Sequence, residues 1–194
     1  MKVQIEKVFA MPASADVCWQ FLQDIAAVGA CMPGATITER LDDTHYKGTV
    51  TVKVGPATMS FRGDIEVREL DAATRTLRLI GKGSDTTGTS GASIDLTARV
   101  EAAEGGASNL VGKSDASVSG KAAAFGGRMM TSVADQVLKQ FAANFAAQVE
   151  SLKAPRAGAA PPASPPARHE LNGLALFWAI LKDWIRGLFS KQQG

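Results

Sequence analysis

The chain has 194 residues, enough for one domain of about 150 residues with its own core and an additional C-terminal segment. Two cysteines exclude a disulfide framework, and the lack of a basic start followed by an apolar run argues against a secretory signal, so we expect a cytoplasmic protein. Residues 1–152 hold 15 Lys+Arg against 17 Asp+Glu, and this slightly acidic balance argues against nucleic acid as a partner.

The first elements are predicted to be a strand and two short helices. Lys2–Met11 alternates weakly between apolar and polar residues, which indicates a strand. Ser14 is a candidate N-cap for a helix whose apolar positions continue to Ile25. A short second helix or turn then reaches Ala30. Extended chain should follow Pro33, because proline disfavours helix in the residue before it.

Alternation is strong in the middle of the chain and predicts an antiparallel meander. Gly55 and Pro56 form one of its turns, and Gly105 and Gly106 form another. The strands expected from this pattern are Tyr46–Val54, Met59–Arg68, Arg75–Gly83, Gly91–Ala103 and Ala107–Ser119.

One long helix is predicted over Gly120–Leu152, where apolar residues recur almost every fourth position from Phe125 to Val149. A helix turns about 100° per residue, so this spacing drifts by about 40° per step, and the partner surface must be curved. We therefore expect an α+β fold in which a curved antiparallel sheet wraps around the helix.

Small residues dominate the inward positions of the last predicted strand, which are Leu110, Gly112, Ser114, Ala116 and Val118. Further glycines on other strands are Gly48, Gly63, Gly81 and Gly83. Because protein cores pack densely, the space beside such residues is either closed by backbone approach or occupied by something else. The two alternatives are close packing and an apolar ligand pocket.

The C-terminal part of the chain is predicted to be a linker followed by an amphipathic helix. Residues 153–169 are rich in Pro and Ala and hold five of the eight prolines, which is typical of an extended linker. Residues 170–194 have an apolar run too short to span a bilayer, so they should lie in the membrane interface. A protein groove is the alternative partner. The predicted membrane-binding residues are Leu174, Phe177, Trp178, Leu181, Trp184, Ile185 and Leu188.

Several motifs together carry a family resemblance. They are Ala30–Ala35 (ACMPGA), Tyr46–Gly48, Val52–Pro56 (VKVGP), Phe61–Gly63 and Phe125–Arg128. In this combination, residues 1–152 closely resemble the CoxG family of carbon monoxide dehydrogenase subunits, within the START-like (SRPBCC) helix-grip superfamily. Members of that superfamily hold hydrophobic ligands between a curved sheet and a long C-terminal helix.

The resemblance implies a non-catalytic accessory protein of a molybdenum hydroxylase, usually carbon monoxide dehydrogenase. It further implies that the protein binds a quinone such as menaquinone or ubiquinone, without a covalent cofactor, and recruits the enzyme to the inner face of the cytoplasmic membrane. Two alternatives stay open: an enzyme of the polyketide-cyclase or aromatase kind on the same fold, and a recruitment scaffold with a filled core.

Methionine and aromatic side chains adapt to flat apolar ligands and are the predicted ligand-binding set, although the same residues also suit an ordinary core. The set is Met32, Tyr46, Met59, Phe61, Phe125, Met129, Met130 and Phe141.

No catalytic or metal site is predicted. His45 and Tyr46 are adjacent on a strand and point to opposite faces, with Tyr46 inward, so they form no dyad. Cys31 is expected to be a small buried residue rather than a nucleophile. Two separated cysteines and one histidine in the domain lack the spacing of metal ligands.

Overall fold

The computed structural model describes residues 1–153. The predicted linker beyond Lys153 and the predicted terminal helix lie outside these residues. The elements in chain order are β1 (Lys2–Met11), α1 (Ala15–Leu22), α2 (Ile25–Cys31), β2 (Ala35–Arg40), β3 (His45–Val54), β4 (Ala57–Asp71), β5 (Thr76–Asp85), β6 (Ser90–Ala102), β7 (Ser108–Gly120) and α3 (Gly127–Lys153).

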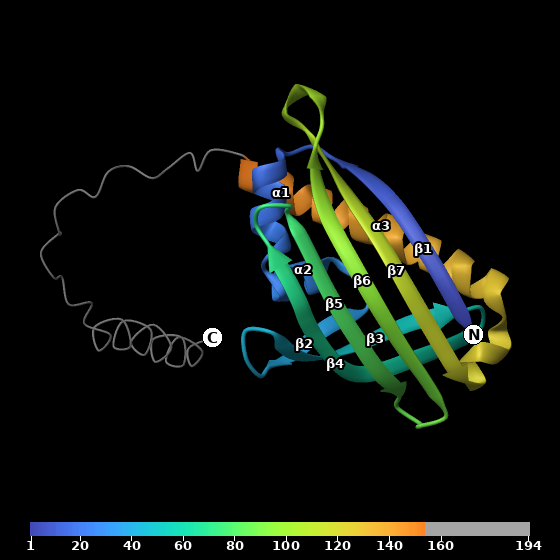
Figure 1. Cartoon of the computed structure of the whole chain (residues 1–194). Coiled ribbons are helices and arrows are strands. Elements are labelled where there is room, and N and C mark those ends of the chain that lie inside the picture. The colour runs from blue at the N-terminus through green and yellow to red at the C-terminus, as the bar shows by residue number, and fades with distance from the viewer. Residues whose placement is uncertain (154–194) are drawn as a thin grey trace, which may run out of the picture. The chain divides into compact units, whose positions relative to one another are not determined.

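The seven strands form one antiparallel sheet in the order β1-β7-β6-β5-β4-β3-β2. In Figure 1 the viewer faces the side of the sheet that no helix of the described residues covers, and α1, α2 and α3 lie behind it. We call these sides the outer and inner faces. The predicted α+β architecture, a curved antiparallel sheet with a long C-terminal helix on one side, is confirmed.

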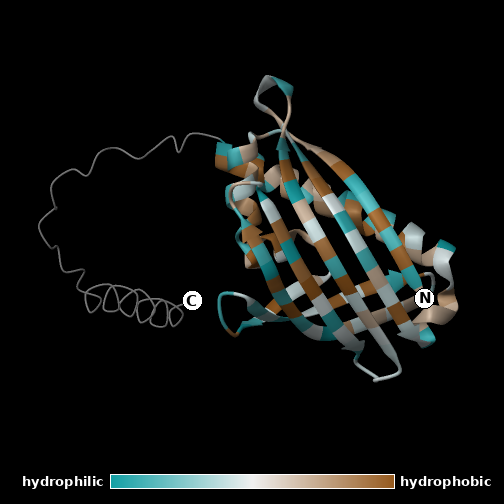
Figure 2. Ribbon diagram, viewed as in Figure 1, coloured by the Kyte–Doolittle hydropathy of each residue, from teal (hydrophilic) through white to brown (hydrophobic). Residues whose placement is uncertain are grey.

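Side chains alternate between the two faces along each strand, as Figure 2 shows by hydropathy. On β3, Tyr46 and Val54 are buried on the inner face, whereas Lys47 and Lys53 are exposed. Ion pairs such as Arg78–Asp95 join neighbouring strands on the outer face. This alternation confirms each predicted strand, with ends that shift by a few residues.

The start of the long helix was predicted wrongly. Gly120 and Gly126 both have positive φ values, 70° and 80°, which interrupt a helix at each position. Between them Lys121–Phe125 forms a 3₁₀ helix, and its first amide donates to the carbonyl of Thr89 at 3.1 Å. The α-helix therefore begins only at Gly127, because apolar periodicity does not reveal a break made by glycine.

Glycines let β3, β4 and β5 approach each other closely. Gly63 lies opposite Gly48 on one side and Gly83 on the other, so three glycines form a row across the sheet. A Cβ atom at Gly63 would lie 2.1 Å from the carbonyl oxygen of Lys82 and 2.6 Å from the Cα of Gly83. At Gly63 and Gly83 the space beside glycine is therefore closed by backbone.

We expect Gly63→Ala to lower the free energy of unfolding by about 3 kcal/mol, since backbone would have to move to admit the methyl group. Gly112→Ala is the matched control, because a Cβ atom there meets nothing within 4 Å. The control should change stability by less than about 1 kcal/mol. Equal losses in urea denaturation of the two variants would contradict the close approach at Gly63.

Candidate functional site

The packed core lies at one end of the sheet, under α1, α2 and the C-terminal part of α3. Phe145 and Val149 of α3 are completely buried, and the ring of Phe145 meets that of Phe21 edge-on at 4.9 Å. Ser14 caps α1, as predicted: its hydroxyl accepts from the amide of Val17. These helices close this end with side chains.

Solvent reaches the inner face of the sheet away from this end. Ile94 and Leu96 occupy inward positions on β6, a strand with neighbours on both sides, yet both are only half-buried. On the facing part of α3, Val133 and Val137 are half-buried as well. Inward side chains of a densely packed layer would be fully buried. Within the described residues, these inward side chains therefore stay partly accessible to solvent.

The placement of α3 explains why these inward side chains are only half-buried. Among the strands, α3 approaches β1 and β3 most closely, and these lie at or next to the two edges of the sheet. Lys7, on the inner face of β1, forms an ion pair of 2.9 Å with Asp135 of α3. The helix is thus held near the rims of the curved sheet and approaches its central strands less closely.

Gly112 differs from Gly63 in its surroundings. It lies in the inward position of β7 that follows the buried Leu110, two residues along the strand. A Cβ atom at Gly112 would meet nothing within 4 Å. The sequence left two explanations for small residues on the inner face, close packing and a ligand pocket, and the structure shows close packing at Gly63. Backbone closes the space at Gly63, whereas the space at Gly112 is open.

Three of the predicted ligand-binding residues lie in or near the packed region. Tyr46 belongs to the core, and its hydroxyl donates to the carbonyl of Asp43 at 3.2 Å. Phe141 packs against the core and lies 5.8 Å from Phe145, measured between ring centroids. Met32, half-buried, follows α2 as its C-cap.

The other predicted residues lie toward the opposite end. Met59 and Phe61 occupy inward positions of β4 and are half-buried. Phe125 ends the 3₁₀ helix, and Met130 lies in the first turn of α3. Met129 is 39% exposed and lies against the β3–β4 turn. Contact of these residues with a ligand stays a prediction.

The inner face also contains aliphatic residues that the predicted ligand set omits. Alternation had assigned Ile94 and Leu96 to the interior, and periodicity had assigned Val133 and Val137 to the apolar side of the helix. Nothing in their chemistry separates a ligand contact from ordinary core. Only their incomplete burial in the folded chain sets them apart.

The reactive side chains of the domain are engaged in structure. Burial raises the pKa of both thiols, Cys18 and Cys31, which agrees with the prediction that Cys31 is a small buried residue. His45 is exposed on the outer face, and its Nδ1 lies 2.9 Å from Asp42. Residues 1–153 contain no group of three His, Cys, Asp or Glu side chains able to hold a metal ion.

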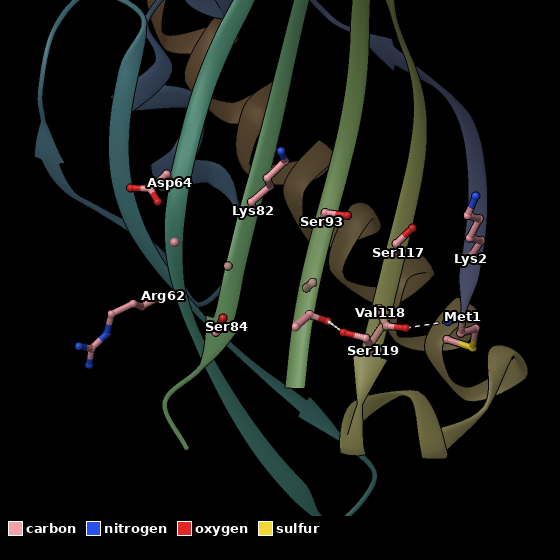
Figure 3. A pocket seen from close by; sticks show the side chains of 14 residues that line it. Met1, Lys2, Arg62, Asp64, Lys82, Ser84, Ser93, Ser117, Val118 and Ser119 are labelled. Carbon is pink, nitrogen blue, oxygen red and sulfur yellow. Dashed lines mark hydrogen bonds between the residues drawn. The ribbon is translucent and has the colours of Figure 1, made fainter. Parts of the chain in front are cut away.

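A polar trough of about 770 Å³ crosses the outer face (Figure 3). Outward side chains in register on five strands line it, namely Asp64, Lys82, Ser93, Ser117 and Lys2. None of the predicted ligand-binding residues belongs to this trough. A smaller depression of about 190 Å³ beside His45 includes Tyr46 in its lining. Charged walls suit polar partners and differ in chemistry from the apolar inner face.

Comparison with known families assigns the domain. Residues 8–150 match the family described as CoxG, a carbon monoxide dehydrogenase subunit. The chain belongs to the CoxG family. This confirms the resemblance carried by its short motifs. A comparison with curated proteins finds no significant match.

Solved structures similar to this CoxG-family chain share its fold at low identity. A conserved protein from Geobacillus kaustophilus has 18% identity and a TM-score of 0.69, over 77% of this chain and 96% of that one. The Zhui aromatase/cyclase from Streptomyces sp. R1128 has 15% identity and a TM-score of 0.59, over 81% and 99%. A START superfamily protein from Mycobacterium smegmatis has 17% identity and a TM-score of 0.56, over 77% and 98%. These likenesses establish the START-like helix-grip fold.

Within residues 1–153, no helix combines the length and the apolar character that a membrane span requires.

Proposed function

We propose that this protein binds a quinone-like apolar molecule between α3 and the centre of the sheet and supplies it to a molybdenum hydroxylase, carbon monoxide dehydrogenase first among them. In this proposal the domain breaks no bond in its ligand. The terminal segment 170–194 keeps the protein at the inner face of the cytoplasmic membrane, where such ligands dissolve.

The incomplete burial of the inner face is the observation that carries this proposal. Apolar surface on Ile94, Leu96, Val133 and Val137 remains in contact with water in the folded domain. Covering such surface with a ligand is favourable by about 25 cal/mol per Å². A flat hydrophobic molecule gains this free energy, whereas a scaffold with a filled core would have no such surface to cover.

Ser114 supplies a polar group at a suitable place for a quinone. It occupies an inward position of β7, in register with Ile5 on β1 and Leu96 on β6. A single hydroxyl among aliphatic neighbours can donate to a ligand carbonyl and fix its orientation. We assign this role to Ser114 as part of the proposal.

We expect Gly112→Phe to reduce quinone binding at least about tenfold, because its ring would occupy open space beside β7. Thr97→Phe is the matched control, since Thr97 lies on the outer face of β6 and pairs with the residue that follows Gly112. Both variants and the parent protein are purified, extracted with organic solvent and analysed by mass spectrometry, and the apo proteins are titrated with a naphthoquinone. Quinone-free extracts together with no binding in the titration of the parent protein would refute the proposal.

The fold shared with the Streptomyces aromatase/cyclase makes an enzyme the second candidate function. Lys7 and Tyr46, two titratable side chains on the inner face, are already engaged with Asp135 and with the carbonyl of Asp43. Turnover of an aromatic polyketide by a protein that binds no quinone would favour the enzyme.

A further inference from the structure

Exposed cations gather at the end of the domain opposite the packed core. This basic end comprises Lys2, Lys53, Arg62, Lys121 and Arg128, all of which are exposed. No carboxylate within residues 1–153 forms an ion pair with any of them. A domain that is slightly acidic overall therefore keeps a cluster of available positive charges at one end.

Most cations elsewhere in the domain are paired, and the exceptions within residues 1–153 are Lys82, Lys139 and Lys153. Arg75 binds Asp16 near the packed core, and Lys113 binds Glu6 in the middle of the sheet. Asp85 lies at the end of β5 in the β5–β6 hairpin, and Asp64 lines the outer trough together with Lys2 and Arg62. Hydrogen bonds from the hydroxyl of Thr87 and from backbone amides of the turn lower the pKa of the Asp85 carboxyl and hold it within the hairpin.

Contacts between distant segments place these cations at one end of the domain, with Lys2 and Arg62 on opposite sides of the trough (Figure 3). The amide of Lys121 donates to Thr89 in the β5–β6 hairpin, and Met129 of α3 lies against the β3–β4 turn that follows Lys53. Met1 lies beside Gly127 at the start of α3. Figure 1 shows the N-terminus, the end of β3 and the start of α3 at the same end of the molecule.

Apolar side chains are exposed among these charges. Met1 is 37% exposed and Met129 is 39% exposed, and Pro56 is exposed in the β3–β4 turn. Cations around a few exposed apolar side chains are the composition with which peripheral proteins bind anionic membranes.

We propose that the basic end docks on an anionic lipid surface and thereby turns the open part of the interior toward the bilayer. This inference rests on the proposed function and adds a membrane contact made by the folded domain itself. The contact places the half-buried inner side chains of β6 and α3 near the membrane, so an apolar ligand passes between lipid and protein with little exposure to water.

A lipid surface fits these features better than an acidic protein does. The cations come from five separate segments and surround exposed methionines, and two of them, Lys2 and Arg62, line the outer trough. Such an arrangement meets a fluid surface of mobile anionic headgroups, which adjust to the positions of the charges.

The test compares two charge-reversed variants of the full chain on lipid vesicles. Lys121→Glu with Arg128→Glu changes the basic end, whereas Lys139→Glu with Lys153→Glu makes the same change in net charge elsewhere on the exposed surface. Acidic residues at the start of a helix are favourable, so the first variant should fold. We expect it to lose about tenfold or more of its partition onto phosphatidylglycerol-containing vesicles relative to the control variant.

Four further measurements decide between explanations. Binding to pure phosphatidylcholine vesicles should be the same for both variants, and added salt should shrink their difference on anionic vesicles. Equal partition of the two variants onto anionic vesicles would overturn the inference. So would loss of binding to the purified hydroxylase with unchanged lipid partition, which would assign the basic end to a protein partner. Naphthoquinone titration without lipid tests the proposed function separately. The difference between the two variants on vesicles does not depend on whether the protein binds a quinone.

Discussion

Removal of residues 170–194 is expected to release the protein from membranes while the domain stays folded. The deleted segment holds the predicted anchor residues, among them Trp178 and Trp184. Burying such side chains in the bilayer interface would strengthen binding by several kcal/mol, so its loss should lower partition onto phosphatidylcholine vesicles by about a hundredfold. The measurement is co-sedimentation with vesicles, together with urea unfolding of both proteins.

A substitution control separates the apolar anchors from the length of the tail. Replacing Trp178 and Trp184 with serine keeps every charge and should reproduce most of the loss. On anionic vesicles the deletion protein should keep a weaker binding that disappears with added salt, because the basic end remains. Unchanged sedimentation of the deletion protein with both kinds of vesicle would reject the anchor, and the protein-groove alternative would then explain the segment.

Phe145→Ala is expected to lower the free energy of unfolding by about 4 kcal/mol, which is typical for the loss of a completely buried aromatic ring. The ring contacts Phe21 across the packed region, and its removal leaves a cavity between α1 and α3. For a domain of this size the melting temperature should fall by roughly 10 °C.

Phe61→Ala is the matched control, since Phe61 also points inward but is only half-buried. It should cost less than about half as much stability, because part of its ring already faces water. The same variant should bind quinone more weakly than the parent protein. Equal destabilisation by the two substitutions would show that the interior is packed throughout, and the carrier proposal would lose its support.

The division into a packed end and an open end connects these predictions. Most of the stability of the domain comes from the packing of side chains of α1 and α2 against Phe145 and Val149. The open end contributes less to that core, so its residues are available to hold a ligand or to meet a membrane. Ion pairs such as Lys7–Asp135 are about 40% exposed and stabilise the helix position only weakly, by less than about 1 kcal/mol.

Local pattern was enough to predict most elements of the domain. Strand alternation placed Tyr46 inward and His45 outward, and the structure confirms both because side chains on a strand must alternate. The N-cap at Ser14 was also correct. The start of the long helix was wrong, because Gly120 and Gly126 adopt positive φ values that apolar spacing does not record.

Alternation could not decide what lies beside each inward glycine. Gly63 and Gly112 look alike in sequence, since both lie at inward positions of strands. Their surroundings differ because the strand next to Gly63 places backbone within 2.1 Å of a Cβ atom, whereas Gly112 faces open space. Such distances depend on how the sheet bends, which is a property of several strands together.

The sequence by itself determined the family, through short motifs, and the face on which each strand residue lies. It also determined the composition of the segment beyond Lys153. Tertiary structure alone decided which inward residues are packed and which stay open, and which cations of the described domain lack partners. The reason is physical: orientation follows from the geometry of one chain segment, whereas burial and ion pairing depend on segments that are distant in sequence and meet only in the folded domain.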